Sequence, residues 1–378
     1  MKKILVFASF APSLLLFRAH LIQAFLDEGH SVSVLVPIST IDSDFSINFS
    51  KRFPTVKVLS IDMALHGMNP FKDFKFILGL KALFKKEQPD IVLSYTIKPV
   101  IYGSIAARWA KVRFIYAMIT GLGTMFELTG FKGKLIHQLV KVLYRYGLRQ
   151  CQKVIFQNPD DQAYFVKLKL VELGKTMRVN GSGVDLSYFS PALLPEKVSF
   201  IFIGRLVKEK GIHEFIEAAK QIYFAYPQAK FCVVGDVFEG HPSSIDHGQL
   251  QDLKSMPCFD WAGQVADVAG YIAKNSVMIL PSYREGTPRS VLEAMAMGRP
   301  IITTDAPGCR ETAMDGVNGF LVPIKNVDAL VEKMEYFLHN PRECERMGQE
   351  SRKLVEQKFD VHQVNQVILE TILGQVNE

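Results

Sequence analysis

The sequence predicts an α/β protein of two doubly wound domains that face each other across a cleft. Short apolar runs alternate with segments of helical periodicity along the 378 residues, as in successive parallel β-α-β units. The stretch 180–196 interrupts the alternation with Gly- and Pro-rich turns, and a new apolar run begins after it. A chain of this length can bury two cores. We therefore expect one domain over 1–185 and a second over 186–360.

The expected strands follow in order along each half. In the first domain they are 4–7, 32–36, 56–61, 91–94, 114–118 and 154–156. In the second domain they are 200–203, 231–235, 259–261, 277–280, 301–303 and 320–322. Residues 361–378 should form a helix that packs back towards the N-terminal domain, with Val364, Val367, Ile368 and Ile372 on one side. Ligands of such sheets bind at the carboxyl ends of the strands.

The composition, 48% hydrophobic and 22% charged, is that of a globular protein, and no apolar stretch reaches the ~20 residues of a membrane-spanning helix. Lys2, Lys3 and the apolar residues 4–17 could form a signal peptide, but Pro12 and the closely following Arg18 favour a buried strand and a helix. The five scattered cysteines fit a reducing compartment and no metal site. We expect a cytoplasmic protein.

The charge is divided unevenly along the chain. Residues 1–190 hold 25 Lys and Arg against 13 Asp and Glu, a net +12, whereas the remaining 19 basic and 25 acidic residues give −6. No nucleic-acid-binding signature accompanies the basic half, so we expect no nucleic-acid partner. Attraction to anionic lipid would explain the division, and ordinary surface variation would explain it equally well.

The segment 281–300 (PSYREGTPRSVLEAMAMGRP) contains the most informative motif. A buried strand ends in a polar turn, and a helix begins near Pro288, a residue suited to a first helical turn. A helix start favours an anionic ligand, and carboxylates such as Glu285 and Glu293 accept hydrogen bonds from sugar hydroxyls. Taken alone, Glu285 could be a charge at the helix start and Glu293 a surface residue. The whole segment favours a ligand site.

A second motif covers 202–212 (FIGRLVKEKGI), where a strand runs into Gly204, a basic loop and a helix that opens at Gly211. Arg205 offers a planar fork for two phosphate oxygens and Lys210 a compact charge. Charges held where a diphosphate leaves would stabilise the transition state by about 3–4 kcal/mol per contact. A solvated basic turn is the alternative.

Together, these motifs resemble the retaining GT-B glycosyltransferases of family 4. The likeness covers nearly the whole chain, including the linker around Val184-Asp185, the pair Gly235-Asp236 and the motif Gly316-x-Asn318-Gly319. Within the family, the segments 94–103 (SYTIKPVIYG) and 119–123 (ITGLG) resemble enzymes that extend undecaprenyl-diphosphate-linked sugars. That subgroup includes N-acetylgalactosaminyltransferases.

The resemblance implies transfer of a hexose or N-acetylhexosamine, with retention, from a UDP-sugar to a polyprenyl-diphosphate-linked saccharide. It implies no metal and no other cofactor. The donor would be bound by Gly204, Arg205, Lys210, Val265, Glu285, Gly286, Thr287 and Glu293, and the catalytic residues would be Glu285, Arg205 and Lys210. On the acceptor or phosphate side it implies Lys98, Gly121 and Gly123.

Three positions depart from the family pattern. Residues 9–12 (SFAP) stand where many members have a Gly-Gly turn, Ile97 stands where a histidine is frequent, and Arg289 replaces a small residue. The sequence Asp42-Ser43-Asp44 spells the D-x-D of metal-dependent transferases, but it lies in a polar loop beyond its strand, and we expect no metal there.

The segment 131–153 carries Lys134, Gln138, Lys141, Arg145 and Arg149 at helical spacing, and it has no acidic residue. Such a helix is typical of an interface with anionic headgroups, and also of a surface helix that buries an apolar stripe. We expect it to bind the cytoplasmic face of the inner membrane, with 71–86 adding to the surface.

Three alternatives remain open. A non-hydrolysing sugar-nucleotide epimerase shares the architecture, but its acid–base residues find no counterpart. A nicotinamide-dependent enzyme would need Gly-x-Gly-x-x-Gly after the first strand, where residues 8–12 read ASFAP. A non-catalytic nucleotide-binding, membrane-associated protein would leave the full set of charged motif residues unexplained.

Overall fold

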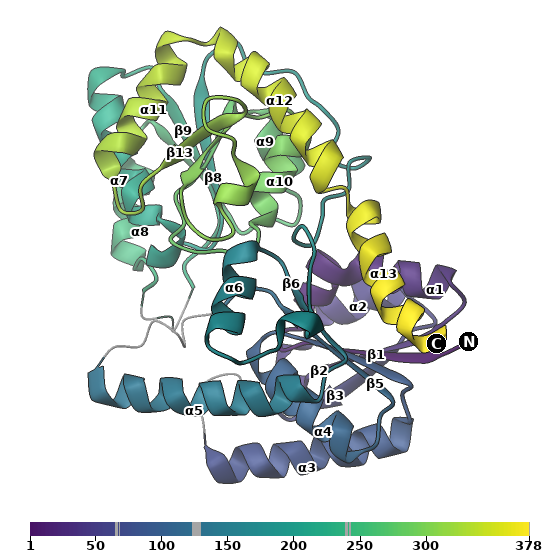
Figure 1. Ribbon diagram of the computed structural model, residues 1–378. Coiled ribbons are helices and arrows are strands. Elements are labelled where there is room, and N and C mark those ends of the chain that lie inside the picture. Colours follow the sequence, from purple (N-terminus) through teal and green to yellow (C-terminus); the bar gives the residue numbers. More distant parts are fainter. Residues whose placement is uncertain (65–66, 68, 123–129, 239–240, 242, 378) are drawn as a thin grey trace. The chain divides into compact units, whose positions relative to one another are not determined.

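The computed structural model describes residues 1–377 except 65–66, 68, 123–129, 239–240 and 242, and of 130–135, 252 and 375–377 only the main chain. The chain forms two compact units (Figure 1). Unit 1 comprises Met1–Ser182 and Asn365–Glu378, and unit 2 comprises Gly183–Val364. The changes of unit lie close to the predicted boundaries at 185–186 and 360–361.

Unit 1 holds a seven-stranded parallel sheet of order β3-β2-β1-β4-β5-β6-β7. The order changes direction between β1 and β4, so right-handed crossovers place helices on both faces. Its strands are β1 Lys3–Phe7, β2 Ser31–Pro37, β3 Lys57–Ile61, β4 Ile91–Tyr95, β5 Phe114–Ile119, β6 Lys153–Phe156 and β7 Thr176–Arg178. Its helices are the π-helices η1 Leu14–Arg18 and η3 Pro99–Gly103, the α-helices α1 Ala19–Asp27, α2 Ser43–Arg52, α3 Pro70–Glu87, α4 Ser104–Trp109, α5 Gly130–Arg149 and α6 Pro159–Lys167, and the short 3₁₀ turns η2 Ile38–Thr40 and η5 Leu173–Lys175.

Unit 2 holds a six-stranded parallel sheet of order β10-β9-β8-β11-β12-β13. Its strands are β8 Ser199–Ile203, β9 Lys230–Val234, β10 Phe259–Gly263, β11 Val277–Leu280, β12 Ile301–Thr304 and β13 Gly319–Val322. Its helices are α7 Ile212–Ala225, α8 His247–Ser255, α9 Ala269–Ala273, α10 Arg289–Ala296, α11 Val327–His339, α12 Arg342–Lys358 and the 3₁₀ turns η6 Lys208–Lys210 and η7 Arg310–Thr312.

Continuous apolar runs form the centre of both sheets. All four residues of β11 and all five of β8 are buried, as expected of parallel strands covered by helices on both faces. The predicted strands are confirmed with small shifts at their ends. The strand β7 was not predicted, because three residues that are mostly half-buried give no apolar run.

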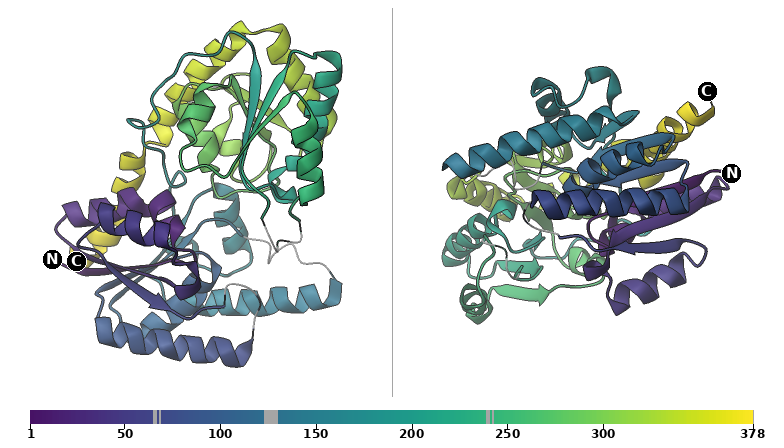
Figure 2. Two further views of the ribbon diagram at one scale, coloured as in Figure 1. Left: turned by 180° about the vertical axis from the view of Figure 1, so that it is seen from behind. Right: turned by 90° about the horizontal axis from the view of Figure 1, so that it is seen from below.

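The C-terminal helix α13 (Val361–Asn377) leaves unit 2 at its first turn and joins unit 1 (yellow in Figures 1 and 2). Val364, Ile368 and Ile372 are buried, and the Tyr116 hydroxyl donates to the Ile372 carbonyl at 3.1 Å. Val367, predicted on the same side, is 44% exposed. The buried apolar stripe of α13 is therefore narrower than the spacing of its apolar residues predicted.

Two sequence expectations are corrected. The helix predicted over 131–153 ends at Arg149, because Lys153 opens β6 by pairing with Tyr116 of β5. The D-x-D sequence, expected in a polar loop, lies at the start of α2, where Asp42 is the N-cap and accepts from the Phe45 amide at 2.6 Å. The Asp42 carboxylate therefore has a structural role in satisfying the helix start.

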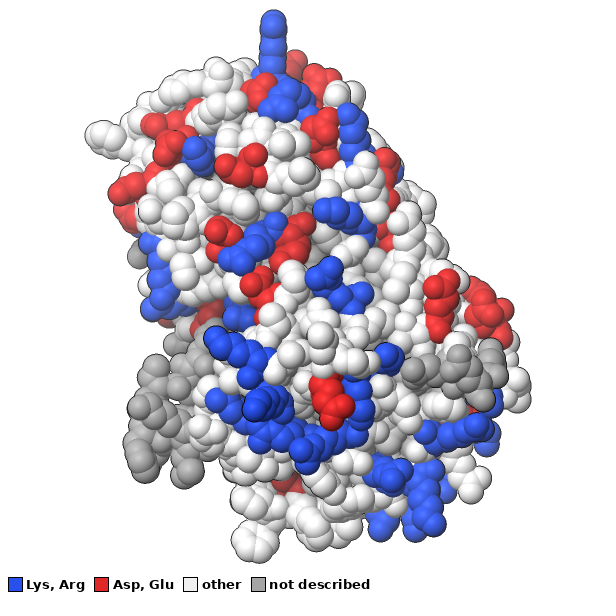
Figure 3. Space-filling view, viewed as in Figure 1, with Lys and Arg blue, Asp and Glu red and all other residues white. Residues whose placement is uncertain are grey.

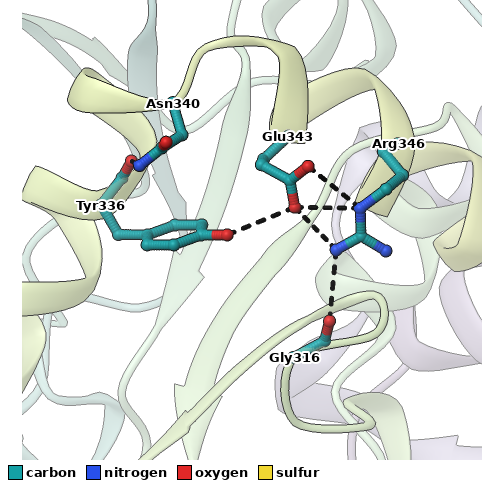
Figure 4. A network of polar contacts seen from close by, with 5 residues as sticks. All are labelled: Gly316, Tyr336, Asn340, Glu343 and Arg346. Atoms are coloured by element: carbon teal, nitrogen blue, oxygen red, sulfur yellow. Dashed lines mark hydrogen bonds and ion pairs between the residues drawn. The ribbon is translucent and has the colours of Figure 1, made fainter.

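The Gly316-x-Asn318-Gly319 motif shapes the loop that leads into β13. Asn318 is fully buried, accepts from the Met314 amide and donates to the Thr312 carbonyl. On the outside of this loop, Arg346 of α12 binds Glu343 and the Gly316 carbonyl, and Tyr336 of α11 donates to Glu343 (Figure 4). The motif is thus bonded to α12, and α12 is in turn bonded to α11 through Tyr336.

None of the helices, over the residues that the structure describes, combines the length and the apolar character that crossing a membrane requires.

Candidate functional site

Lys210 and Glu285 form an ion pair in unit 2. Lys210 ends η6 after β8, and Glu285 lies in the turn between β11 and α10. Because β8 and β11 are neighbours in the parallel sheet, their carboxyl ends bring these loops together. The Lys210 Nζ lies 2.5 Å from the Glu285 Oε1, and the two side chains are 19% and 12% exposed. A cation suited to phosphate therefore stands beside a carboxylate suited to sugar hydroxyls.

The main chain holds these two loops at close range. Gly211 has φ +72°, and a Cβ there would lie 2.2 Å from the Pro281 carbonyl oxygen. A Cβ at Gly308 would lie 2.1 Å from the Glu285 carbonyl oxygen, which explains the glycine in the next loop. The amides of Tyr283 and Glu285 donate to the carbonyls of Glu209 and Pro307, each at 2.9 Å. The loops that carry the ion pair therefore pack so closely that positions 211 and 308 accept only glycine.

Glu293 lies within α10, where it is only 8% exposed. Its Oε1 accepts from the Arg289 Nε at 2.8 Å, one helical turn away. Burial raises the pKa of the Glu293 carboxyl, and the charge of Arg289 opposes that shift. The surface-residue alternative is therefore wrong for Glu293, and Arg289, a departure from the family pattern, is its partner.

The other predicted donor residues lie in loops after β8, β10 and β11. Arg205 is exposed, and its guanidinium stacks over the Phe238 ring at 5.2 Å, a contact the sequence did not indicate. Gly204 packs against Gly235 so closely that a Cβ at Gly235 would meet the Gly204 carbonyl oxygen. Val265 is half-buried beyond β10, where the Trp261 indole donates to the Gly235 carbonyl at 2.8 Å.

Gly286 and Thr287 complete the turn before α10. Gly286 is buried, and the Thr287 hydroxyl donates to the Gly286 carbonyl at 2.9 Å. The helix that follows starts at Arg289, and Pro288 is its N-cap. The sequence predicted Pro288 within the first turn, so the helix begins one residue later than expected.

In unit 1, Lys98 follows β4, and its Nζ donates to the Ala64 carbonyl at 2.6 Å. Burial lowers the pKa of this ammonium. Gly121 lies beyond β5 with φ +130°, and Gly123 is outside the described residues. The structure thus directs Lys98 towards the loop after β3.

Two family models match the two halves of the chain. Residues 3–158 match the glycosyl transferase 4-like model, and residues 188–354 match the model of glycosyl transferases group 1. The chain is a glycosyltransferase. Its motifs around Gly204, Lys210 and Glu285 fall within the second match.

Curated relatives resemble this glycosyltransferase over most of their length. One is the N,N'-diacetylbacillosaminyl-diphospho-undecaprenol α-1,3-N-acetylgalactosaminyltransferase of Campylobacter jejuni, 27% identical over 86% of both chains. Another is the UDP-Gal:α-D-GlcNAc-diphosphoundecaprenol α-1,3-galactosyltransferase of Escherichia coli, 29% identical over 74% of both chains.

Among solved structures, Anabaena HepE in complex with UDP and glucose matches 99% of this chain and 100% of its own, with a TM-score of 0.80 at 19% identity. That likeness confirms the predicted fold of the glycosyltransferase. The epimerase, nicotinamide-enzyme and non-catalytic alternatives find no support in these comparisons.

Proposed function

We propose that this enzyme transfers a hexose or N-acetylhexosamine, with retention of configuration, from a UDP-sugar to a polyprenyl-diphosphate-linked saccharide. The Lys210–Glu285 pair supports the donor half of the proposal, because it combines a phosphate-binding cation with a carboxylate for sugar hydroxyls. Two curated relatives act, by their names, on undecaprenyl-diphosphate-linked sugars, which supports the acceptor half.

In this proposal the donor binds to unit 2. Lys210 and Arg205 bind the diphosphate, Glu285 accepts from donor-sugar hydroxyls, and Glu293 accepts from the ribose. Main-chain groups of Gly204, Gly286 and Thr287 complete the diphosphate and sugar contacts, and those near Val265 meet the base. The two cations supply the charge for the leaving diphosphate, so the reaction as we propose it uses no metal and no other cofactor.

The bond changes are few. The bond between the anomeric carbon and the diphosphate oxygen breaks, a bond to the acceptor hydroxyl oxygen forms on the same face, and the acceptor proton passes to the leaving phosphate. Negative charge grows on the diphosphate as the bond breaks, so cations fixed by the backbone stabilise the transition state more than the ground state.

Thermal-shift measurements with UDP, GDP, their sugar conjugates and NAD test the donor site. A ligand at 100 times its dissociation constant should add about 2.7 kcal/mol to the free energy of unfolding. We expect stabilisation by UDP and UDP-sugars that is insensitive to chelator and is lost in Arg205→Ala. Stabilisation by NAD alone, or by none of these ligands, would contradict the proposal.

We further propose that α5, with α3, binds the cytoplasmic face of the inner membrane. Leu139, Val142 and Tyr146 share one side of α5 and are 43%, 56% and 46% exposed. The buried side of α5 is formed by other residues, among them Val140, Tyr144 and Leu148. An exposed apolar strip flanked by basic residues is what an interfacial helix presents.

Basic side chains lie on the same helix as this strip. Lys141 and Arg149 belong to the basic side of α5, and Figure 3 shows Lys and Arg gathered over the region of α5 and α6. On α3, Phe71 and Phe74 are 88% and 54% exposed. Figures 1 and 2 show α3 and α5 running along the same side of unit 1.

Vesicle flotation tests this membrane surface. Arg145 donates to the carbonyls of Leu168 and Lys169 at the end of α6, so its replacement would disturb the fold. We therefore choose Lys141→Gln with Arg149→Gln, which should weaken binding to phosphatidylglycerol vesicles about 30-fold, at about 1 kcal/mol for each charge. Lys333→Gln on α11 of unit 2 is the control. Equal flotation of the double variant and wild type would contradict the proposal.

A further inference from the structure

A cluster of hydroxyl groups lies at the carboxyl ends of β1 and β4 in unit 1. These two strands are neighbours at the point where the strand order changes direction. Such a point is where doubly wound sheets form their binding crevice. Each strand is followed by a π-helix, η1 or η3, a rare conformation that is frequent at functional sites.

Thr96, directly after β4, has φ +70°. Among the non-glycine residues of positive φ in the described part of the chain, Thr96 alone is β-branched, a class for which this conformation is a true outlier. Strained backbone of this kind persists where the surrounding structure enforces it, commonly at binding sites. Nothing in the local sequence predicts it.

The strained conformation directs the Thr96 side chain towards β1. The Thr96 Oγ1 lies 2.8 Å from the Ser9 Oγ, and it also contacts the Tyr95 carbonyl. Ser9 and Thr96 are both half-buried, so the pair remains accessible. Phe10, next to Ser9 in the chain, is 50% exposed. An aromatic surface beside hydroxyls can contact both the apolar face and the hydroxyls of a sugar.

The loop that carries Ser9 is bonded to residues at or just beyond the ends of both neighbouring strands, β4 and β2. The Ser13 Oγ lies 2.8 Å from the Tyr95 Oη, and the Arg18 guanidinium stacks over the Tyr95 ring at 5.0 Å. The Ala11 amide donates to the Thr40 Oγ1 at 3.1 Å, beyond β2. Ser9 is therefore presented from an ordered loop.

We propose that Ser9 and Thr96 form a hydroxyl pair that binds a hydroxyl of the acceptor saccharide, with Phe10 against its apolar face. Lysine can only donate and carboxylate can only accept hydrogen bonds, whereas two linked hydroxyls can do both, as a sugar hydroxyl requires. The inference rests on the proposed transferase function. It assigns a contact to Ser9 and Phe10, which stand where many family members have a Gly-Gly turn.

Steady-state kinetics with GlcNAc-diphospho-undecaprenol and the UDP-sugar that stabilises the enzyme best test the pair. Thr96→Val keeps the side-chain shape and removes the hydroxyl, and Ser9→Ala removes its partner. Each should raise the KM for the acceptor about tenfold or more, with the KM for the UDP-sugar changed less than about twofold. Thr96→Ser should restore the acceptor KM, and the double variant should be little worse than either single variant.

Ser50→Ala, on the exposed side of α2, is the matched control and should leave both KM values unchanged. A wild-type enzyme that transfers sugar, with Thr96→Val and Ser9→Ala unaffected in acceptor KM, would overturn the inference and leave the function standing. If Thr96→Ser fails to restore the acceptor KM, the raised KM of Thr96→Val comes from a disturbed loop and not from the lost hydroxyl, which would also overturn the inference. A wild-type enzyme that transfers nothing would overturn the proposed function, and the inference with it.

Discussion

Lys210 and Glu285 balance each other's charge at the candidate donor site, and single substitutions should separate their roles. Glu285→Gln removes the acceptor of sugar hydroxyls and leaves Lys210 free to bind phosphate. We expect a loss of turnover of about 10²–10³-fold, the usual cost of one transition-state contact, with UDP affinity kept or increased. Lys210→Ala leaves a carboxylate without this cation where the diphosphate binds, so both UDP affinity and turnover should fall.

Isothermal titration calorimetry with UDP measures the UDP affinity, and a transfer assay measures the turnover. Glu332→Gln, on α11, is the control for loss of a surface carboxylate. Normal turnover in Glu285→Gln would remove this residue from the catalytic site.

If Glu293 binds the ribose as proposed, its burial should make nucleotide binding depend on pH. Since burial raises its pKa above the ordinary 4.5, the carboxyl takes up a proton at a higher pH than an exposed glutamate does. Ribose binding as proposed needs the carboxylate, so UDP affinity should fall as the pH drops through the raised pKa. Comparison with Glu293→Gln at each pH cancels the titration of the phosphate itself. Identical pH profiles for the two proteins would contradict the assignment.

The same shift has a consequence for stability. The folded state holds the Glu293 proton more tightly than the unfolded chain does. The contribution of this group to the free energy of unfolding is therefore complete below pH 4.5 and is lost as the pH rises through the folded pKa. Urea unfolding of wild type and Glu293→Gln should therefore diverge as the pH rises, with the variant relatively more stable at neutral pH. Divergence in the opposite direction would show that the Arg289 contact outweighs burial.

Among the elements of unit 2, the linker, α9 and α10 are held together by one buried side chain. Arg299 is fully buried and donates to six carbonyls, those of Ile272, Asn275, Ala192, Met297, Leu193 and Ala273. Burial lowers its pKa to about 10, so it remains charged at neutral pH. Arg299→Met should lower the free energy of unfolding by about 3–5 kcal/mol, because several buried carbonyls lose their donor.

Urea unfolding measures this loss, and Arg342→Met, at the exposed start of α12, is the control, with an expected change within about 0.5 kcal/mol. A loss no larger than that of the control would show that water or main-chain donors replace the guanidinium.

At the scale of elements, apolar runs sufficed to predict the strands, because parallel strands buried on both faces leave a clear pattern. The pattern failed where burial is partial. The edge strand β7 has no buried residue, and the exposed Leu139 and Val142 of α5 lie where a buried stripe could equally have been read. Arg299 was visible in the sequence only as part of a motif, since nothing local indicates that a guanidinium will meet six carbonyls.

For the molecule as a whole, the sequence predicted two doubly wound units and the meeting of Lys210 and Glu285 in the second, because both residues follow strands that the sheet places side by side. The contacts made by Ser9, Thr96 and Phe238 could not be predicted. They depend on a strained backbone angle and on side-chain stacking, neither of which has a sequence pattern.

One measurement tests the central claim most directly. The enzyme is incubated with GlcNAc-diphospho-undecaprenol and each UDP-sugar, and the lipid-linked product is analysed by mass spectrometry and by NMR of its new anomeric carbon. We predict one added hexose or N-acetylhexosamine with the α configuration of the donor, and release of UDP. A β-linked product, or release of UDP with no sugar added to the lipid-linked acceptor, would contradict retaining transfer to this class of acceptor.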